Sequence, residues 1–146
     1  MRLCDVLDLK GRQVHTALPN DTVMDAVRKL MAHNIGALAV VDVDGQLVGI
    51  ISERDILRML VHEAALLDIA RVAERMTRKV VTASPTDDVN ECLNVMTGHH
   101  IRHLPVCEQG KLTGMVSIGD LVKSRLDDAV FETRQLTAMV TGQYPA

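Results

Sequence analysis

The sequence has 146 residues, of which 47% are hydrophobic and 24% are charged, and its formal net charge is -3. This length suits one compact domain or two small units that share a core, and the composition is that of a folded globular protein. The weak negative charge and the scarcity of aromatic residues, one phenylalanine and one tyrosine, argue against nucleic-acid binding. We therefore expect any bound ring to lie between aliphatic side chains.

The cysteines and the apolar runs indicate where the protein works. Cys4, Cys92 and Cys107 are odd in number and lack C-x-x-C spacing, which favours reduced thiols over disulfides or zinc ligands. Residues 1–10 are charged and lack the apolar region of a signal peptide. No apolar run approaches the ~20 residues that a transmembrane helix needs. We expect a cytoplasmic protein with neither a membrane nor a nucleic acid as partner.

The first half of the chain predicts a β-α-β-β-α unit. An extended segment, 14–19, ends in a proline and leads into an amphipathic helix. The apolar residues of this helix fall on one face: Val23, Ala26, Val27, Leu30 and Met31. Two apolar runs, 37–41 and 47–51, enclose an Asp-Gly pair and are typical of a β-hairpin. A second helix is predicted from Ser52.

A second copy of the unit follows in the same order. Residues 80–85 repeat the segment 14–19 at an offset of 66 residues. Another amphipathic helix follows, and then a hairpin formed by 103–107 and 112–116. A last helix is predicted from Ser117. An internal duplication of this kind indicates two similar units packed against each other, because neither is expected to bury its sheet alone.

Three segments lie outside the duplicated units. Residues 59–76 predict a continuous connector helix, residues 1–11 form an N-terminal flank, and residues 127–140 have helical periodicity. The predicted fold is α+β, with flanking N- and C-terminal helices. We place the first unit and its flank in residues 1–66, and the second unit with the connector and C-terminal helices in residues 67–146.

One motif, G-x-x-S-x-x-D, occurs in both copies, at 49–55 and at 114–120, where a strand runs into a helix. Free amides and the positive end of the helix dipole make such a junction suitable for a phosphate. The serine adds a hydroxyl, and the aspartate can accept both hydrogens of a ribose diol. The residues concerned are Ser52, Asp55, Ser117 and Asp120. The alternative is that serine and aspartate only cap the helix.

Two further pairs of positions are candidates for ligand contacts. Thr16 and Thr82 lie at equivalent places, where a hydroxyl can bond a base or sugar, or where threonine simply suits an extended segment. Arg102 and His103 stand where the first copy has Gly36 and Ala37. They can bind a phosphate; the alternative for the arginine is solvation at a strand edge.

Other chemistry has little support. His99, His100 and His103 lie within five positions, but His99 and His100 point to different sides of a helix end and no acid or thiolate has ligand spacing to them. The chain contains no G-x-S-x-G, H-E-x-x-H or P-loop pattern. We therefore predict neither a metal site nor catalytic residues.

These motifs resemble those of the cystathionine-β-synthase-type (CBS) domain family, in particular the stand-alone tandem CBS pair of bacteria. The resemblance covers residues 8–130 and rests on S-E-R-D at 52–55, R-H-L-P-V at 102–106 and S-I-G-D at 117–120. Each motif is moderately specific by itself, and the ordered duplicate is strongly so.

The resemblance implies two repeats packed sheet to sheet about a pseudo-twofold axis, with two clefts for adenosyl ligands such as AMP, ATP, an NAD-type dinucleotide or S-adenosylmethionine. AMP or an NAD-type ligand is the main expectation. Carried over by position, Asp55 and Asp120 would bind the ribose, and Ile35, Ile101 and Leu104 would wall the adenine. The phosphate would be bound by Ser52, Ser117, Arg102 and His103, with Arg54 as a further partner. Thr16 and Thr82 would bind the adenosine or its phosphate.

The departures from the family pattern predict unequal clefts. The first copy lacks the Arg-His pair, and the second has Gly119 where the first has Arg54. We prefer the cleft that Ser117 and Asp120 would form with Arg102. The resemblance also implies a homodimer.

The predicted function is an adenine-nucleotide-responsive regulatory module without catalytic activity, whose state an effector protein reads. The alternatives are a dimerisation or assembly module with vestigial clefts, and a fragment of a purine-pathway dehydrogenase.

Overall fold

A computed structural model describes residues 1–141 of the chain. The last five residues of the second predicted unit, which include Tyr144, lie outside it. The elements follow one another as α1 (Leu3–Lys10), β1 (Thr16–Ala17), α2 (Val23–His33), β2 (Ala37–Val41), β3 (Leu47–Ser52), α3 (Glu53–Glu63), the 3₁₀ turn η1 (Ala64–Leu66), α4 (Val72–Arg75), α5 (Val89–Gly98), β4 (His103–Glu108), β5 (Lys111–Ser117) and α6 (Ile118–Thr141). The two β-α-β-β-α repeats predicted from the sequence are therefore present.

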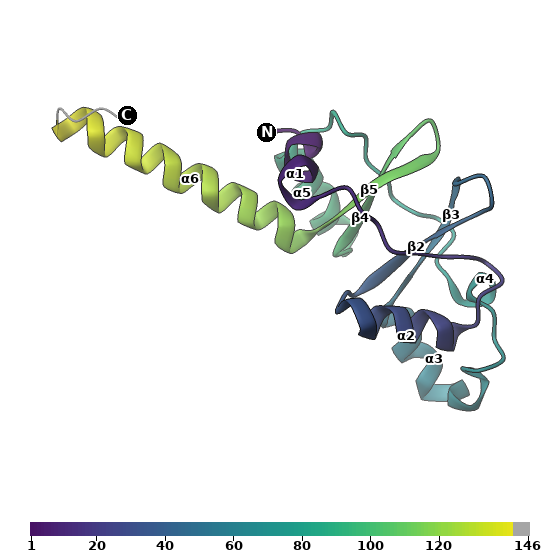
Figure 1. Cartoon of the computed structure of the whole chain (residues 1–146). Helices are drawn as coiled ribbons and strands as arrows, with labels where there is room; N and C mark the ends of the chain where they lie inside the picture. The colour runs from purple at the N-terminus through teal and green to yellow at the C-terminus, as the bar shows by residue number, and fades with distance from the viewer. Residues whose placement is uncertain (142–146) are drawn as a thin grey trace.

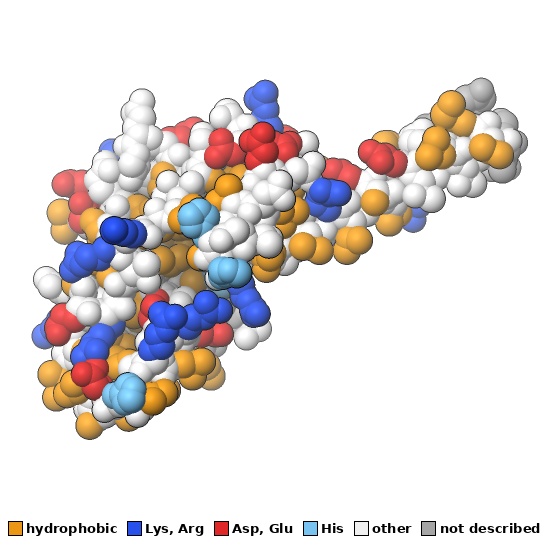
Figure 2. Space-filling view, turned by 180° about the vertical axis from the view of Figure 1, so that it is seen from behind, with side chains coloured by type: hydrophobic (Ala, Val, Ile, Leu, Met, Phe, Trp, Pro, Cys, Tyr) orange, Lys and Arg blue, Asp and Glu red, His pale blue; other side chains and the backbone are white. Residues whose placement is uncertain are grey.

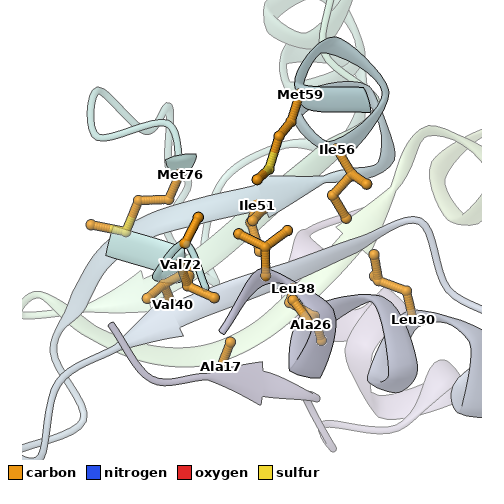
Figure 3. Packing of buried hydrophobic residues seen from close by; sticks show 12 residues of the cluster. Ala17, Ala26, Leu30, Leu38, Val40, Ile51, Ile56, Met59, Val72 and Met76 are labelled. Atoms are coloured by element: carbon orange, nitrogen blue, oxygen red, sulfur yellow. The ribbon is translucent and has the colours of Figure 1, made fainter. Parts of the chain in front are cut away.

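The first repeat is built on a three-stranded sheet in the order β1-β2-β3. β1 runs parallel to β2, and β3 runs antiparallel to it with Leu38 opposite Ile51. Thr22 caps the start of helix α2. Its hydroxyl accepts from the Asp25 amide, and the Asp25 carboxylate accepts from the Thr22 amide. Figure 3 shows Leu38 and Ile51 in the middle of the core that this sheet shares with α2 and α3.

The second repeat copies this arrangement with a shorter first strand. β4 and β5 form an antiparallel hairpin, and only a single parallel bridge, Ala83 to Val106, stands in the place of the β1–β2 pairing. The Asp88 carboxylate accepts from the amides of Asn90 and Glu91 and so caps α5. In Figure 1 the two sheets lie between the helices of the first repeat on one side and those of the second on the other.

Each repeat receives the flanking segment of the other. Leu3, Val6 and Leu7 of α1 belong to the hydrophobic core of the second repeat. Val72 and Met76 of the connector belong to the core of the first. Each core is thus completed by a segment from the other predicted unit, which agrees with the prediction that neither repeat buries its sheet alone. The division of the chain at residue 66 stays a prediction, but the flanks pack across it.

The connector is not the continuous helix that residues 59–76 predict. Helix α3 ends at Glu63, and a 3₁₀ turn and the four-residue α4 follow. The backbone carbonyls of Leu67 and Ala70 instead accept from the amides of Met24 and Val23, in the first turn of α2. These carbonyls accept hydrogen bonds from the free N–H groups at the start of α2. They therefore do not form the hydrogen bonds of a continuous connector helix.

The C-terminal flank is not a separate helix. Residues 127–140 continue the helix that begins after Ser117, and α6 spans 24 residues. Figure 1 shows its far part extending away from the body.

The hairpins of the two repeats contact each other near their turns, where the Leu47 amide donates to the Gly110 carbonyl at 3.1 Å. None of the helices within residues 1–141 combines the length and apolarity needed to cross a membrane.

Candidate functional site

A cleft of about 480 Å³ lies between the two repeats. This volume is in the range of small-molecule sites. Its walls come from four parts of the chain: the turn before β2 at Gly36, the β3–α3 junction, the segment after α4, and the turn between α5 and β4. Figure 2 shows Lys, Arg and His side chains gathered round the middle of one face of the body. A ligand in this cleft would touch both repeats at once.

The β3–α3 junction places a carboxylate in the cleft wall. Asp55 Oδ2 accepts from the Ser52 amide at 2.9 Å and from the Ser52 hydroxyl at 3.1 Å. Asp55 Oδ1 accepts from the Thr77 hydroxyl at the longer distance of 3.4 Å. Asp55 therefore caps α3, as the alternative interpretation expects. Capping by itself does not exclude a ligand contact, because a carboxylate offers about four lone-pair sites.

Positive charge outweighs negative charge around the cleft. Its basic residues are Arg54, Arg58, Lys79 and Arg102, and its acidic residues are Glu53 and Asp55. Lys79 and Arg102 come from the second half of the chain and Asp55 from the first. The cleft thus combines an acceptor for hydroxyl groups with an excess of donors for an anion such as phosphate.

His103 reaches the cleft because the first repeat has a glycine opposite it. A Cβ atom at Gly36 would lie 3.1 Å from His103 Cε1, so a larger residue there would crowd the imidazole. Burial lowers the pKa of His103 below its ordinary value, and the nearby Lys10 and Arg102 act in the same direction. Glu53 and Asp120 oppose them. Its surroundings therefore favour the neutral form of the imidazole.

Aliphatic side chains supply the remaining surface. They are Ile50, Leu57, Val80, Val81 and Ile101. Ile101 and Val81 also pack against the core of the second repeat, which holds them in place. These side chains can cover the faces of a flat ring without an aromatic residue, as the composition predicts.

Six of the twelve predicted site residues line this cleft: Ser52, Arg54, Asp55, Ile101, Arg102 and His103. Six others lie elsewhere: Thr16, Ile35, Thr82, Leu104, Ser117 and Asp120. Leu104 is 1% exposed and belongs to the core of the second repeat, so it cannot wall a ligand here. Thr82 lines a separate hollow with Ser84 and Asp87. Ile35 packs against the core of the first repeat, and Thr16 lies in β1.

The preferred grouping of Ser117 and Asp120 with Arg102 is not the one found in this cleft. Arg102 lies with Ser52 and Asp55, because the turn before β4 faces the first repeat. Asp120 instead pairs with Lys10, whose Nζ lies 2.6 Å from Oδ2. The Ser117 amide donates to the same oxygen at 2.8 Å, and the Ser117 hydroxyl accepts from the Asp120 amide at 3.1 Å.

The sequence pattern does not indicate that the segment directly after the connector lines the cleft. Thr77 and Lys79 line the cleft, together with Val80 and Val81. The repeat itself contains the signal, because Thr77 and Lys79 directly precede the matched segment 80–85 and Val80 and Val81 are its first residues. His99 and His100, considered above as metal ligands, also line the cleft. No group of three or more His, Cys, Asp or Glu residues within 1–141 could hold a metal ion.

Solved structures share this architecture. A CBS-domain protein from Agrobacterium tumefaciens superimposes with a TM-score of 0.81 at 39% identity, over 86% of this chain and 99% of that one. The CBS domain pair of protein MJ0100, crystallised with 5'-methylthioadenosine and S-adenosyl-L-methionine, gives a TM-score of 0.76 at 32% identity, over 88% and 97% of the two chains.

Sequence comparison points the same way. A mitochondrial CBS domain-containing protein of Arabidopsis thaliana, CBSX3, is 36% identical over 97% of this chain and 73% of its own length. The family model of the CBS domain matches residues 6–62 and again residues 69–127. The two matches coincide with the two structural repeats and include both S-x-x-D junctions. The chain therefore belongs to the CBS domain family, as a pair of CBS repeats.

Proposed function

We propose that the chain is a regulatory module that binds one adenine nucleotide, such as AMP, in the cleft between its repeats. The observation that carries the proposal is the pairing of Asp55 from the first repeat with Arg102 and Lys79 from the second half of the chain around a single cleft. A ribose diol and a phosphate are the two groups that a carboxylate and neighbouring cations recognise together.

We assign each part of the nucleotide to a part of the cleft. The ribose hydroxyls donate to Asp55, whose Oδ1 has only the 3.4 Å bond from Thr77 to give up. The phosphate faces Arg102 and Lys79, and the adenine lies between the aliphatic side chains. In the MJ0100 protein, a CBS pair of the same fold binds adenosyl compounds, and this supports an adenosyl ligand here.

Binding alone, without turnover, accounts for the residues present. The cleft joins two repeats that otherwise have separate cores, so a ligand that contacts both favours one relative arrangement of them. An effector protein would read that arrangement. The three cysteines are free thiols, and we propose the cytoplasm as the compartment that keeps them reduced.

A role in assembly is the second candidate, and exposed apolar side chains favour it. In α3, Val61 is 72% exposed. In α6, Leu126, Phe131 and Leu136 are each at least 60% exposed. Surfaces of this kind are typical of protein interfaces, and we propose that a second copy of the chain covers them in a homodimer. Such a dimer is compatible with nucleotide binding, because the cleft lies within one chain.

A calorimetric survey tests the nucleotide proposal. AMP, ATP, NAD and S-adenosylmethionine are titrated into the wild-type chain and into Asp55→Asn, with Asp44→Asn in the exposed hairpin turn as the matched control. We expect at least one ligand to bind and Asp55→Asn to weaken it by more than tenfold, because a hydrogen bond to a charged group contributes about 1.5–3 kcal/mol. Binding of none of the four would overturn the proposal and favour assembly.

A further inference from the structure

The second S-x-x-D junction is built like the first but has different neighbours. Gly114, Ser117 and Asp120 repeat Gly49, Ser52 and Asp55 at an offset of 65 residues. Asp55 receives a neutral hydroxyl from Thr77 at 3.4 Å. Asp120 receives an ammonium group from Lys10 at 2.6 Å. The two carboxylates are therefore not equally available to a ligand.

The flanking segments explain the difference. Leu7 packs over Gly114 as Met76 packs over Gly49, so these two residues are structural equivalents. The numbering then runs nine positions from Leu7 to Thr16, but only six from Met76 to Thr82. The longer segment extends α1 to Lys10, whereas α4 already ends at Arg75. The extra residues form the last turn of α1, which carries Lys10 onto Asp120.

Lys10 is held firmly at this place. Its Nζ also donates to the Met115 carbonyl at 2.7 Å, so the ammonium bridges the strand β5 and the carboxylate. Burial by itself would raise the pKa of Asp120, but the hydrogen bonds from Lys10 and from the Ser117 amide lower it below its ordinary value. The ion pair therefore stabilises the charged carboxylate that a ribose would otherwise contact.

A second pair of residues belongs to the same region by repeat equivalence. The rings of His15 and His33, both in the first copy, stack with their centroids 3.6 Å apart. Their equivalents at the offset of 66 residues are Val81 and His99, and both of these line the open cleft. By this equivalence, His15 and His33 stand at the second site, where their rings contact each other.

We propose that the second nucleotide site of the pair is latent, closed by Lys10 on Asp120 and by the His15–His33 stack, so that one chain binds one nucleotide. This rests on the proposed function for the first cleft. The latent site would take the same class of ligand, a ribose-bearing adenine nucleotide, because its serine and aspartate repeat those of the open cleft. Lys10 and His15 are accordingly the residues that determine how many nucleotides bind.

The test removes both closures and counts bound AMP by calorimetry. In the double variant Lys10→Met and His15→Val, the methionine keeps the length of the lysine without its charge, and the valine copies Val81. We expect one AMP per wild-type chain and two per double-variant chain. Adding Asp120→Asn to the double variant should return the number to one, whereas Lys123→Met on the exposed part of α6 should leave the wild-type number unchanged. Thermal unfolding of each variant verifies that it folds.

The outcomes separate this inference from the proposed function. Two AMP molecules on the wild-type chain, or one on a folded double variant, would overturn the latent site and leave the first cleft intact. If the wild-type chain binds no AMP, the proposed function fails for AMP. The double variant still decides the inference in that case: one AMP that Asp120→Asn abolishes supports the latent site, and no AMP overturns it.

Discussion

The two S-x-x-D junctions begin from nearly the same residues and end in different states. In the first repeat, Ser52 and Asp55 border an open cleft together with Arg102 of the second repeat. In the second repeat, Ser117 and Asp120 form the same cap but Lys10 neutralises the carboxylate. The motif alone therefore does not define a ligand site. The segment that crosses from the other repeat decides whether the carboxylate remains available.

This comparison also shows why the flanks matter for stability. Each flank lies across a glycine in the strand before the junction, Met76 across Gly49 and Leu7 across Gly114. The backbone near Met76 is tied to β3 by the paired bonds of Thr77 and Ile50, whereas Leu7 reaches Gly114 only with the end of its side chain. The first contact should therefore yield less readily than the second.

The largest expected effect is that of Gly49→Ala on stability. Its Cβ would overlap the Met76 side chain and lie 3.0 Å from the Thr77 carbonyl oxygen. We expect the free energy of unfolding to fall by about 1–3 kcal/mol, the usual cost of overpacking. Gly114→Ala should cost less, because its Cβ would meet only side-chain atoms of Leu7 and no backbone atom. Urea denaturation measures both, and equal losses would contradict the difference between the flanks.

The next largest effect is expected when a lysine is introduced beside Asp55 in the open cleft. Thr77→Lys places an ammonium beside Asp55, as Lys10 lies beside Asp120, and we expect it to weaken AMP binding by about tenfold or more, or about 1.4 kcal/mol. Thr77→Val removes only a 3.4 Å hydrogen bond and should change the affinity little. Calorimetry on the two variants measures this, and unchanged affinity in Thr77→Lys would show that the carboxylate is not a ligand contact.

A smaller effect concerns acid stability. The pKa of Asp120 is lowered in the folded chain, so its contribution to stability is present above the unfolded pKa of about 3.9 and is lost as the pH falls through the folded value. Because the pair is partly exposed, we expect it to contribute below about 1 kcal/mol. Asp120→Asn should flatten the loss of unfolding free energy in acid, as urea titrations at successive pH values would reveal. An unchanged acid slope would show that the ion pair contributes nothing.

The smallest expected effect is a proton linkage at His103. Its pKa is lowered by burial in the free chain, and a phosphate beside it would raise that pKa, so binding takes up protons between the free and the bound pKa of the ring. Affinity for AMP should then rise a few-fold as the pH falls through that window. Calorimetry in buffers of different ionisation enthalpy measures the uptake. The same uptake in His103→Gln would place the phosphate away from this ring.

Much of the fold follows from local patterns. The strands predicted at 37–41 and 103–107 are observed as Ala37–Val41 and His103–Glu108, because turn residues between two apolar runs fix a hairpin locally. The connector was not predictable in this way. Its apolar spacing is helical, but the amides of Val23 and Met24 bind its carbonyls, and this is a contact between segments far apart in the sequence.

The site was predictable in its parts but not in its grouping. Ser52, Asp55 and Arg102 were all expected to contact a ligand, but a repeat pattern alone does not say which junction faces which turn. Leu104 was misplaced because Leu104, Pro105 and Val106 are all buried, so β4 shows no alternation from which to choose the face toward the cleft. Lys10 carries no signal at all, since its role depends on the length of its flank.

The most direct test of the account is a crystal structure of the wild-type chain grown with AMP. The account predicts one nucleotide per chain, with its ribose hydroxyls on Asp55, its phosphate facing Arg102 and the Lys10–Asp120 pair intact. A nucleotide beside Asp120 with Lys10 displaced, and an empty cleft at Asp55, would contradict it.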